Sequence, residues 1–337
     1  MNVFKRETLL ILFVYGVLIL DFRMASAANL DIGTARTAFK SKEYSKVIEL
    51  ISPHLDMASK EAFLLLAKSY GASDNAIMAQ KTLNVGLAKF KDDREMGAEL
   101  GKVLLSLNKE REAKATLKDV IDKNPTYEAA YLAMAEIYEK RKNRYELRLL
   151  YQDLVEKLGE KPAYVTKLCD LSVKDGLYDL SFKYCDSGIR LSQKNPDNYV
   201  NMGSAYKETG QDTKANAYFK KAADSFSKSE FAQSSYALFL DGSKNYSQSF
   251  PYWKRATEAD ATSVRAWNGL AHSALEIQKF ADSYAAFEKL CLLEKSAERT
   301  LRQAVGSLKT MNQPTWMEKF TDLVSKCSQA PDGRGRL

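Results

Sequence analysis

The sequence predicts an all-α fold, in which about nine helical hairpins stack into a right-handed α-solenoid. Gly and Pro, which weaken helices, are scarce, with 16 and 7 among 337 residues. A 34-residue pattern repeats from residue 60 onward without an insertion or deletion. Each repeat contains two stretches whose apolar residues have the spacing of an amphipathic helix. Together these observations favour repeated helix pairs.

The first 27 residues differ from the rest and have the three parts of a secretory signal peptide. Two basic residues precede an apolar run over residues 9–20, and the triplet ASA at 25–27 provides a small-x-small cleavage site. We expect cleavage between Ala27 and Ala28. The mature chain is then expected to be periplasmic or secreted.

The alternative is a signal that stays uncleaved and anchors the chain in the inner membrane. The apolar run at 9–20 is shorter than the ~20 residues of a membrane-spanning helix, which favours cleavage. No later stretch is long and apolar enough to cross a bilayer. We therefore expect no stable membrane span in the mature chain.

The repeat can be written as eight units in unbroken phase, preceded by a more divergent one. The units begin near residues 28, 60, 94, 128, 162, 196, 230, 264 and 298. They predict a solenoid over residues 28–327, followed by a polar tail over 328–337 that we expect to be disordered. Positions below are counted from the first residue of each unit.

Each unit predicts a helix, a turn and a second helix. Positions 4, 7, 8 and 11 form an apolar stripe in the first half, and positions 20, 24 and 27 form one in the second half. Position 8 is small in seven of eight units, which lets two antiparallel helices approach closely. Turn residues lie between the stripes, at 174–176, 208–211 and 241–245.

The pattern resembles the tetratricopeptide repeat, a 34-residue helix-turn-helix unit. The residues that carry the resemblance are Trp267, Leu270, Ala271 and Phe287 in one unit, and Tyr199, Met202, Gly203, Tyr206, Gly210, Ala215, Phe219 and Ala222 in another. The resemblance implies a concave face lined by positions 2, 5, 9, 12 and 13 of the first helices. Proteins similar to this one use that face to hold peptides, helices or partner domains.

The unit at 230–263 departs from the pattern. It has Gln233 where an aromatic residue is usual, and Pro251 within its second helix. Proline removes a backbone donor, so it is expected to bend or weaken that helix. A hinge and a tolerated irregularity remain alternatives.

The sequence predicts neither catalysis nor a cofactor or metal. It contains two histidines, His54 and His272, and neither has a partner at a catalytic or metal-binding spacing. Phosphate-binding loops, zinc-protease motifs and C-x-x-C pairs are missing from the sequence. The net charge of +7 comes from interspersed acidic and basic residues, so we expect no nucleic-acid partner.

Four cysteines raise the question of disulfides in an exported chain. Cys169 and Cys185 occupy positions 8 and 24 of one hairpin, which makes them a candidate pair. The alternative is two reduced, buried cysteines. A bond between Cys291 and Cys327, in second helices of adjacent units, is a weaker candidate.

The concave positions supply the candidate partner-binding residues. They are Lys68, Lys102, Glu136, Glu139, Asp170, Lys207, Arg265, Asn268, His272 and Arg302. Chaperone-binding members of the family hold a terminal carboxylate with Lys, Asn and Arg at positions 5 and 9, and that arrangement is missing from this sequence. The mixed charges instead favour a protein or peptide partner, and predict a non-enzymatic scaffold of the cell envelope.

The sequence is also compatible with two other functions. A peptidoglycan- or polysaccharide-associated accessory protein would need aromatic residues on the concave face, and Phe231 alone occupies such a position. A peptide sensor would use Pro251 as a hinge. The sequence leaves the oligomeric state and the identity of the partner undetermined.

Overall fold

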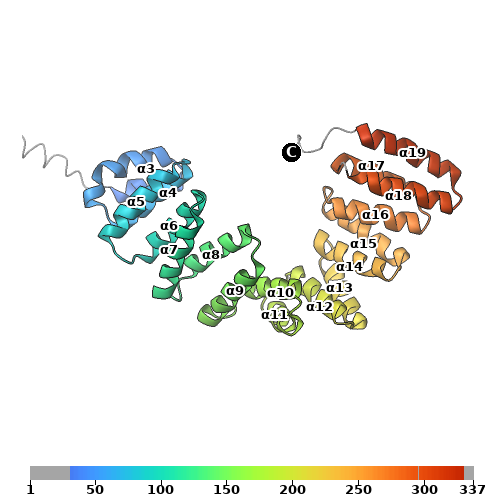
Figure 1. Cartoon of the computed structure of the whole chain (residues 1–337), viewed down its shortest axis with the longest axis horizontal. Coiled ribbons are helices and arrows are strands. Elements are labelled where there is room, and N and C mark those ends of the chain that lie inside the picture. Colours follow the sequence, from blue (N-terminus) through green and yellow to red (C-terminus); the bar gives the residue numbers. More distant parts are fainter. Residues whose placement is uncertain (1–30, 295, 330–337) are drawn as a thin grey trace, which may run out of the picture. The chain divides into compact units, whose positions relative to one another are not determined.

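The computed structural model describes residues 31–294 and 296–329, and the regular elements in this part of the chain are all helices (Figure 1). They pack as consecutive helix pairs, which confirms the predicted all-α repeat fold. The chain divides into two compact bodies, Met1–Asn143 and Arg144–Leu337. The expected signal peptide, its cleavage point at Ala27 and Ala28, and most of the expected tail lie outside the described residues.

The described part of the first body contains three packed hairpins and a further helix. Its elements are α2 (Ile32–Lys40), α3 (Tyr44–Ile51), the 3-10 helix η1 (Ser52–Met57), α4 (Lys60–Ala72), α5 (Ala76–Lys89), α6 (Arg94–Ser106), α7 (Glu110–Lys123) and α8 (Glu128–Lys140). Helices α2 and α3, α4 and α5, and α6 and α7 pack as pairs.

The second body begins with a single helix and continues with five packed hairpins. Its elements are α9 (Arg144–Leu158), α10 (Pro162–Lys174), α11 (Tyr178–Leu191), α12 (Pro196–Glu208), α13 (Asp212–Ser225), α14 (Glu230–Gly242), α15 (Tyr246–Ala259), α16 (Val264–Glu276), α17 (Phe280–Leu293), α18 (Ala297–Thr310) and α19 (Pro314–Gln329). The pairs run from α10 and α11 to α18 and α19.

The turn inside each hairpin uses one residue with a positive φ. The next residue donates its backbone N–H to a carbonyl at the end of the first helix, as Asn245 does to Leu240 at 2.9 Å and Lys279 to Ala274 at 2.8 Å. This is the Schellman arrangement, which closes a helix in a left-handed residue. The left-handed residues are Lys42, Asp74, Asn108, Gly176, Gly210, Lys244, Gln278 and Asn312.

Small residues at position 8 let the helices of a pair lie close together. A Cβ atom at Gly101 would lie 2.5 Å from the side chain of Leu117, and one at Gly203 would lie 3.0 Å from the ring of Phe219. Both partners occupy position 24 of the same repeat. The cores of these two hairpins therefore depend on a small residue facing a large one.

The two departures in the repeat at 230–263 have simple structural outcomes. Gln233 is fully buried, and its side-chain amide donates to the backbone carbonyls of Ala223 and Phe226, at the end of α13. Pro251 lies inside α15, which stays helical from Tyr246 to Ala259.

Two disulfides join helices of the second body. Cys169 and Cys185 link α10 to α11 within one hairpin, and Cys291 and Cys327 link α17 to α19 in adjacent repeats. Each bond closes a loop between helices that already pack together.

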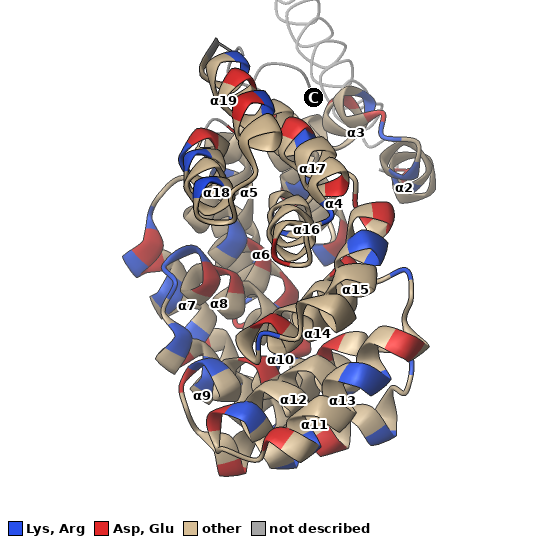
Figure 2. Cartoon of the chain, turned by 90° about the vertical axis from the view of Figure 1, so that its right-hand side faces the viewer, with Lys and Arg blue, Asp and Glu red and all other residues tan. Residues whose placement is uncertain are grey.

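Charges of both signs are interspersed on the exposed helix faces, as on α11, α13 and α19 (Figure 2). Some form pairs one turn apart, such as Arg190 with Asp186 at 3.1 Å. None of the described helices combines the length and the apolar character that a membrane span requires.

Candidate functional site

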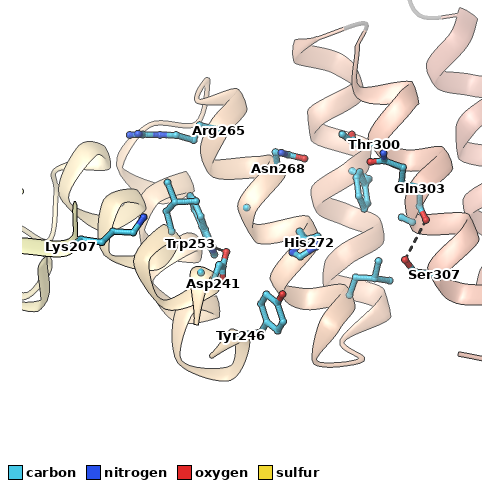
Figure 3. A pocket seen from close by; sticks show the side chains of 16 residues that line it. Lys207, Asp241, Tyr246, Trp253, Arg265, Asn268, His272, Thr300, Gln303 and Ser307 are labelled. Atoms are coloured by element: carbon cyan, nitrogen blue, oxygen red, sulfur yellow. Dashed lines mark hydrogen bonds between the residues drawn. The ribbon is translucent and has the colours of Figure 1, made fainter. Parts of the chain in front are cut away.

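A groove of about 670 Å³ lies in the second body (Figure 3). The first helices α12, α14, α16 and α18 supply most of its lining, and Tyr246 and Trp253 of α15 and Phe287 of α17 complete it. Because successive first helices lie side by side, a partner in this groove would contact several repeats at once.

Four of the predicted residues line this groove: Lys207, Arg265, Asn268 and His272. The last three share one face of α16, because they are separated by three and four residues along the helix. That helix begins cleanly, since the Ser263 hydroxyl oxygen accepts the backbone N–H of Ala266 at 3.1 Å. The cap and the helical spacing together present these side chains to the groove.

The charged members of this set differ in their contacts. Arg265 pairs with Glu230 at 3.0 Å, and its guanidinium lies 5.7 Å from the ring centre of Phe231. His272 Nε2 lies 3.9 Å from an oxygen of Glu276, an ion pair only when the imidazole is protonated. Lys207 makes no ion pair with the described residues and is exposed at one side of the groove (Figure 3).

The other predicted residues do not line this groove. In the second body, Asp170 pairs with Lys174 at 2.8 Å and Arg302 pairs with Glu298 at 2.6 Å. The remaining four are exposed on α4, α6 and α8 of the first body: Lys68, Lys102, Glu136 and Glu139. The predicted set is thus divided between the two bodies.

Asp241 is a groove residue that the sequence interpretation missed. It is half-buried near the end of α14, where the Trp253 indole donates to Oδ2 at 2.7 Å and the Ser249 hydroxyl donates to Oδ1. The sequence pattern predicts a turn at residues 241–245 and places Trp253 at position 24, one of the apolar packing positions. The available signal was the position of Asp241, which is position 12 of its repeat and therefore concave.

Burial shapes the electrostatics around Asp241. Burial raises the pKa of its carboxyl, although the hydrogen bonds from Ser249 and Trp253 and the nearby His272 act in the opposite direction. Burial likewise raises the pKa of the Tyr246 hydroxyl, with a further contribution from Glu276 and Asp241. The groove therefore holds an acidic group whose charged form is poorly solvated.

A glycine makes room for the tryptophan that holds Asp241. A Cβ atom at Gly269 would lie 2.3 Å from the indole ring of Trp253. Trp253 itself is 2% exposed, so it offers no free ring face for stacking a sugar. Its contribution to the groove is to hold the carboxylate of Asp241.

Apolar surface is also available in the groove. Leu238, at position 9 of its repeat, is 55% exposed. The rings of Tyr246 and His272 meet edge to face, with centres 5.5 Å apart. An ion pair with Lys207, hydrogen bonds to Asn268 and contact with Leu238 are interactions that suit a polypeptide segment.

A second cavity, of about 290 Å³, lies in the first body beside α7. Three of its charged residues pair with one another, because Lys123 bonds to Asp92 at 2.7 Å and to Asp119 at 2.8 Å. Within the described residues, no three His, Cys, Asp or Glu side chains gather as metal ligands. The groove of the second body is therefore the stronger candidate site.

Comparison with known proteins identifies the repeat. Residues 196–227, which include α12 and α13, match the sequence model of the tetratricopeptide repeat. The crystal structure of a tetratricopeptide repeat protein from Parabacteroides merdae is similar to this chain, with a TM-score of 0.53 and 11% identity, over 68% of this chain and 91% of that one. Yeast Tom70 is similar with a TM-score of 0.50 and 14% identity, over 81% of this chain and 61% of Tom70. No curated protein matches the sequence.

At such low identities the similarity concerns the fold. The segment at 196–227 matches the tetratricopeptide repeat, and the helix pairs that recur along both bodies have the fold of solved tetratricopeptide-repeat structures.

Proposed function

We propose that the protein is a non-enzymatic scaffold of the cell envelope, which binds a partner protein or peptide in the groove of the second body. The observation that carries this proposal is the lining of that groove. Four repeats contribute to it, and they supply the exposed Leu238 together with the polar side chains of Lys207, Asn268 and His272. Such a mixture suits a polypeptide, which offers both apolar side chains and hydrogen-bonding groups.

An envelope location is supported by two independent features. The basic residues, apolar run and small-x-small triplet of residues 1–27 have the form of a cleaved signal peptide. The four cysteines lie in two disulfides, which persist in oxidising compartments such as the periplasm. We therefore infer export, followed by oxidation of both pairs.

Site-specific photocrosslinking in intact cells tests the binding proposal. A photoreactive residue replaces Leu238 in the groove or, as a control, Ile77 on α5, which is 60% exposed. The replacement at Leu238 is expected to capture a partner that the replacement at Ile77 does not.

A groove-filling variant provides the second arm of this experiment. A Cβ atom at Gly242, which lines the groove, or at Gly71 of the first body meets no atom within 4 Å. Gly242→Phe should therefore abolish capture by the Leu238 probe, whereas Gly71→Phe should not. If Ile77 captures the same partner, or if Gly242→Phe has no effect, the groove is not the binding site.

Export is tested separately by the mass of the chain recovered from fractionated cells. The expected chain begins at Ala28 and is found in the periplasm or the medium. Ala27→Tyr should leave the signal uncleaved and the chain in the inner membrane, because the cleavage site requires a small residue there. An uncleaved natural chain in the membrane fraction would instead favour the anchored alternative.

A further inference from the structure

We propose that the groove recognises an isolated basic side chain, an arginine or a lysine, on an extended segment of the partner, and that Asp241 is the carboxylate that pairs with it. This inference rests on the proposed function, since it names the chemistry of the segment that the same groove binds. Its test uses a readout that is independent of capturing the partner.

The two side chains that donate hydrogen bonds to the Asp241 carboxylate are both neutral. The Trp253 indole donates to one carboxylate oxygen at 2.7 Å, and the Ser249 hydroxyl donates to the other. A carboxylate accepts about four hydrogen bonds, so acceptor capacity remains on the side of the groove. Among the described residues, no Lys or Arg forms an ion pair with it.

Two other shielded carboxylates of this body have a guanidinium partner. Asp175 lies 3.2 Å from Arg148, and Glu230 lies 3.0 Å from Arg265. Asp197 has no such partner, but it lies in the first turn of α12, where the helix dipole favours a negative charge. Asp241 therefore differs from these three groups.

The position of Asp241 on its helix points to a cation. It is the second-last residue of α14, where the helix dipole disfavours a negative charge and favours a positive one. Burial disfavours the charged carboxylate in the same way. A bound ammonium or guanidinium would relieve both effects by pairing with the carboxylate.

The surroundings of Asp241 fit the remainder of a basic side chain. Leu238, one turn earlier on α14, is 55% exposed and can contact the methylene groups of Arg or Lys. The rings of Tyr246 and His272 lie beside the carboxylate (Figure 3). An aromatic ring such as that of Tyr246 attracts a guanidinium, which makes arginine the better fit.

The groove also limits how many positive charges the segment can carry. Lys207 and Arg265 lie on the opposite side of Trp253 from His272 and Gln303 (Figure 3). Arg265 is already paired with Glu230, but further basic residues of the segment would approach Lys207 and be repelled. We therefore expect one basic residue in an otherwise neutral or acidic stretch, and not a polybasic run.

The indole N–H of Trp253 allows a direct test by NMR, because it donates to Asp241. The mature full-length chain is isotope-labelled on its three tryptophans, and Trp267→Phe and Trp316→Phe assign the other two signals. The probe is a short blocked glycine peptide with one central arginine. Matched peptides carry lysine, or citrulline, which has the shape of arginine without its charge.

The expected result is a saturable shift of the Trp253 signal with the arginine peptide, a weaker one with lysine and none with citrulline. Asp241→Asn should lower the affinity for the arginine peptide at least about tenfold. This variant keeps an oxygen for the indole and an amide that can donate to Ser249. Unchanged signals of Trp267 and Trp316 would show that it has folded.

Four outcomes would overturn this inference. Equal shifts with arginine and citrulline would mean that charge is not recognised, and unchanged affinity in Asp241→Asn would mean that another group pairs with the ligand. If a chain ending at Gln329 shows an altered Trp253 signal without any peptide, the occupant is the chain's own terminal segment, which carries Arg334 and Arg336. Capture of a partner at Leu238 that Asp241→Asn does not impair would preserve the proposed function and reject this inference alone.

Discussion

Trp253 is held by its neighbours on both sides, and one of these neighbours is a glycine. Its indole donates to Asp241 on one side, and on the other it covers the backbone of Gly269, where a Cβ atom would lie 2.3 Å from the ring. The ring is part of a core of large side chains that includes Phe287 and Phe320. It therefore has little space in which to move.

We accordingly expect Gly269→Ala to destabilise the second body. Overpacking a core typically lowers the free energy of unfolding by about 1–3 kcal/mol, which exceeds the ~0.5–1 kcal/mol that alanine contributes to a helix. Urea denaturation followed by tryptophan fluorescence measures the change. Gly306→Ala is the matched control, since a Cβ atom there meets nothing within 4 Å, and it should be slightly stabilising. Equal effects of the two substitutions would refute the steric argument.

Asp241 gives the second body a dependence on pH that is unusual for a carboxylate. The pKa of this carboxyl in the folded chain is raised above its ordinary value of 3.8, mainly by burial. Between these two values the folded chain binds more protons than the unfolded chain, so its stability falls as the pH rises through this window. His272 from α16, Tyr246 from α15 and Lys207 from α12 are the other titratable groups of the groove.

The prediction compares Asp241→Asn with the natural chain at two pH values. The variant should gain stability relative to the natural chain between about pH 3 and about pH 7, because it has no carboxyl to deprotonate. Asp93→Asn should change in the opposite direction. Burial raises the pKa of Asp93, but backbone and Lys60 hydrogen bonds outweigh it, and the net pKa is lowered. If the stability of both variants relative to the natural chain changed in the same direction with pH, the opposite pKa shifts of Asp241 and Asp93 would be wrong.

At the scale of elements, the repeat explains why Pro251 can be tolerated. It is the sixth residue of α15, is exposed, and lacks the N–H that would bond to the carbonyl of Ser247. The helix nevertheless continues to Ala259, because Trp253 and Ala256 fix it in the core. Tertiary packing thus offsets a poor local preference.

Pro251→Ala should therefore stabilise the chain, by up to about 3 kcal/mol, since it restores a donor and removes a steric clash. Pro314→Ala is the control, because Pro314 is the first residue of α19, where proline is favourable. Thermal and urea denaturation should separate the two variants clearly. If Pro251→Ala raises the free energy of unfolding no more than Pro314→Ala does, Pro251 does not destabilise α15.

Much of the fold could be predicted because the 34-residue period determines which residues face one another. The turns depend on that period more than on residue type: glycine occupies the left-handed position in two hairpins, but Lys244 and Gln278 adopt it in others. No propensity scale would choose a lysine there. The Schellman bonds from the following residue hold it in place.

Some residues that line the groove could be located from the sequence for the same reason. Lys207, Arg265 and His272 occupy positions that face the concave side of the repeat, so their location could be predicted from their position in the 34-residue unit. Tyr246 was missed because it starts a second helix beside a turn. The role of Trp253 was missed because its packing position says nothing about where its indole N–H points.

At the scale of the molecule, the division into two bodies was not foreseen. It falls between α8 and α9, within the repeat that begins near residue 128. At position 20 that repeat has Leu147, where six other repeats have a small residue: Ala79, Ala113, Ser181, Ala215, Ser249 and Ser283. The sequence thus marks this repeat as atypical although its period is unchanged.

The division has a consequence for unfolding, because the spectroscopic and covalent markers are unevenly distributed. All three tryptophans and both disulfides lie in the second body. Tryptophan fluorescence therefore reports on the second body, whereas circular dichroism reports on the helices of both. Repeat arrays lose two-state behaviour when the coupling between neighbouring parts is weak.

We expect the fluorescence and circular dichroism transitions in urea to differ, and reduction to separate them further. The disulfides close loops of sequence separation 16 and 36, and each should contribute on the order of 3–4 kcal/mol by the chain-entropy relation. A reductant should lower the urea midpoint seen by fluorescence and leave part of the circular dichroism change at its original midpoint. Coincident transitions under both conditions would mean that the two bodies unfold as one unit. In that case, binding of a partner in the groove would stabilise the whole chain against unfolding. Separate transitions would instead confine this stabilising effect to residues 144–337.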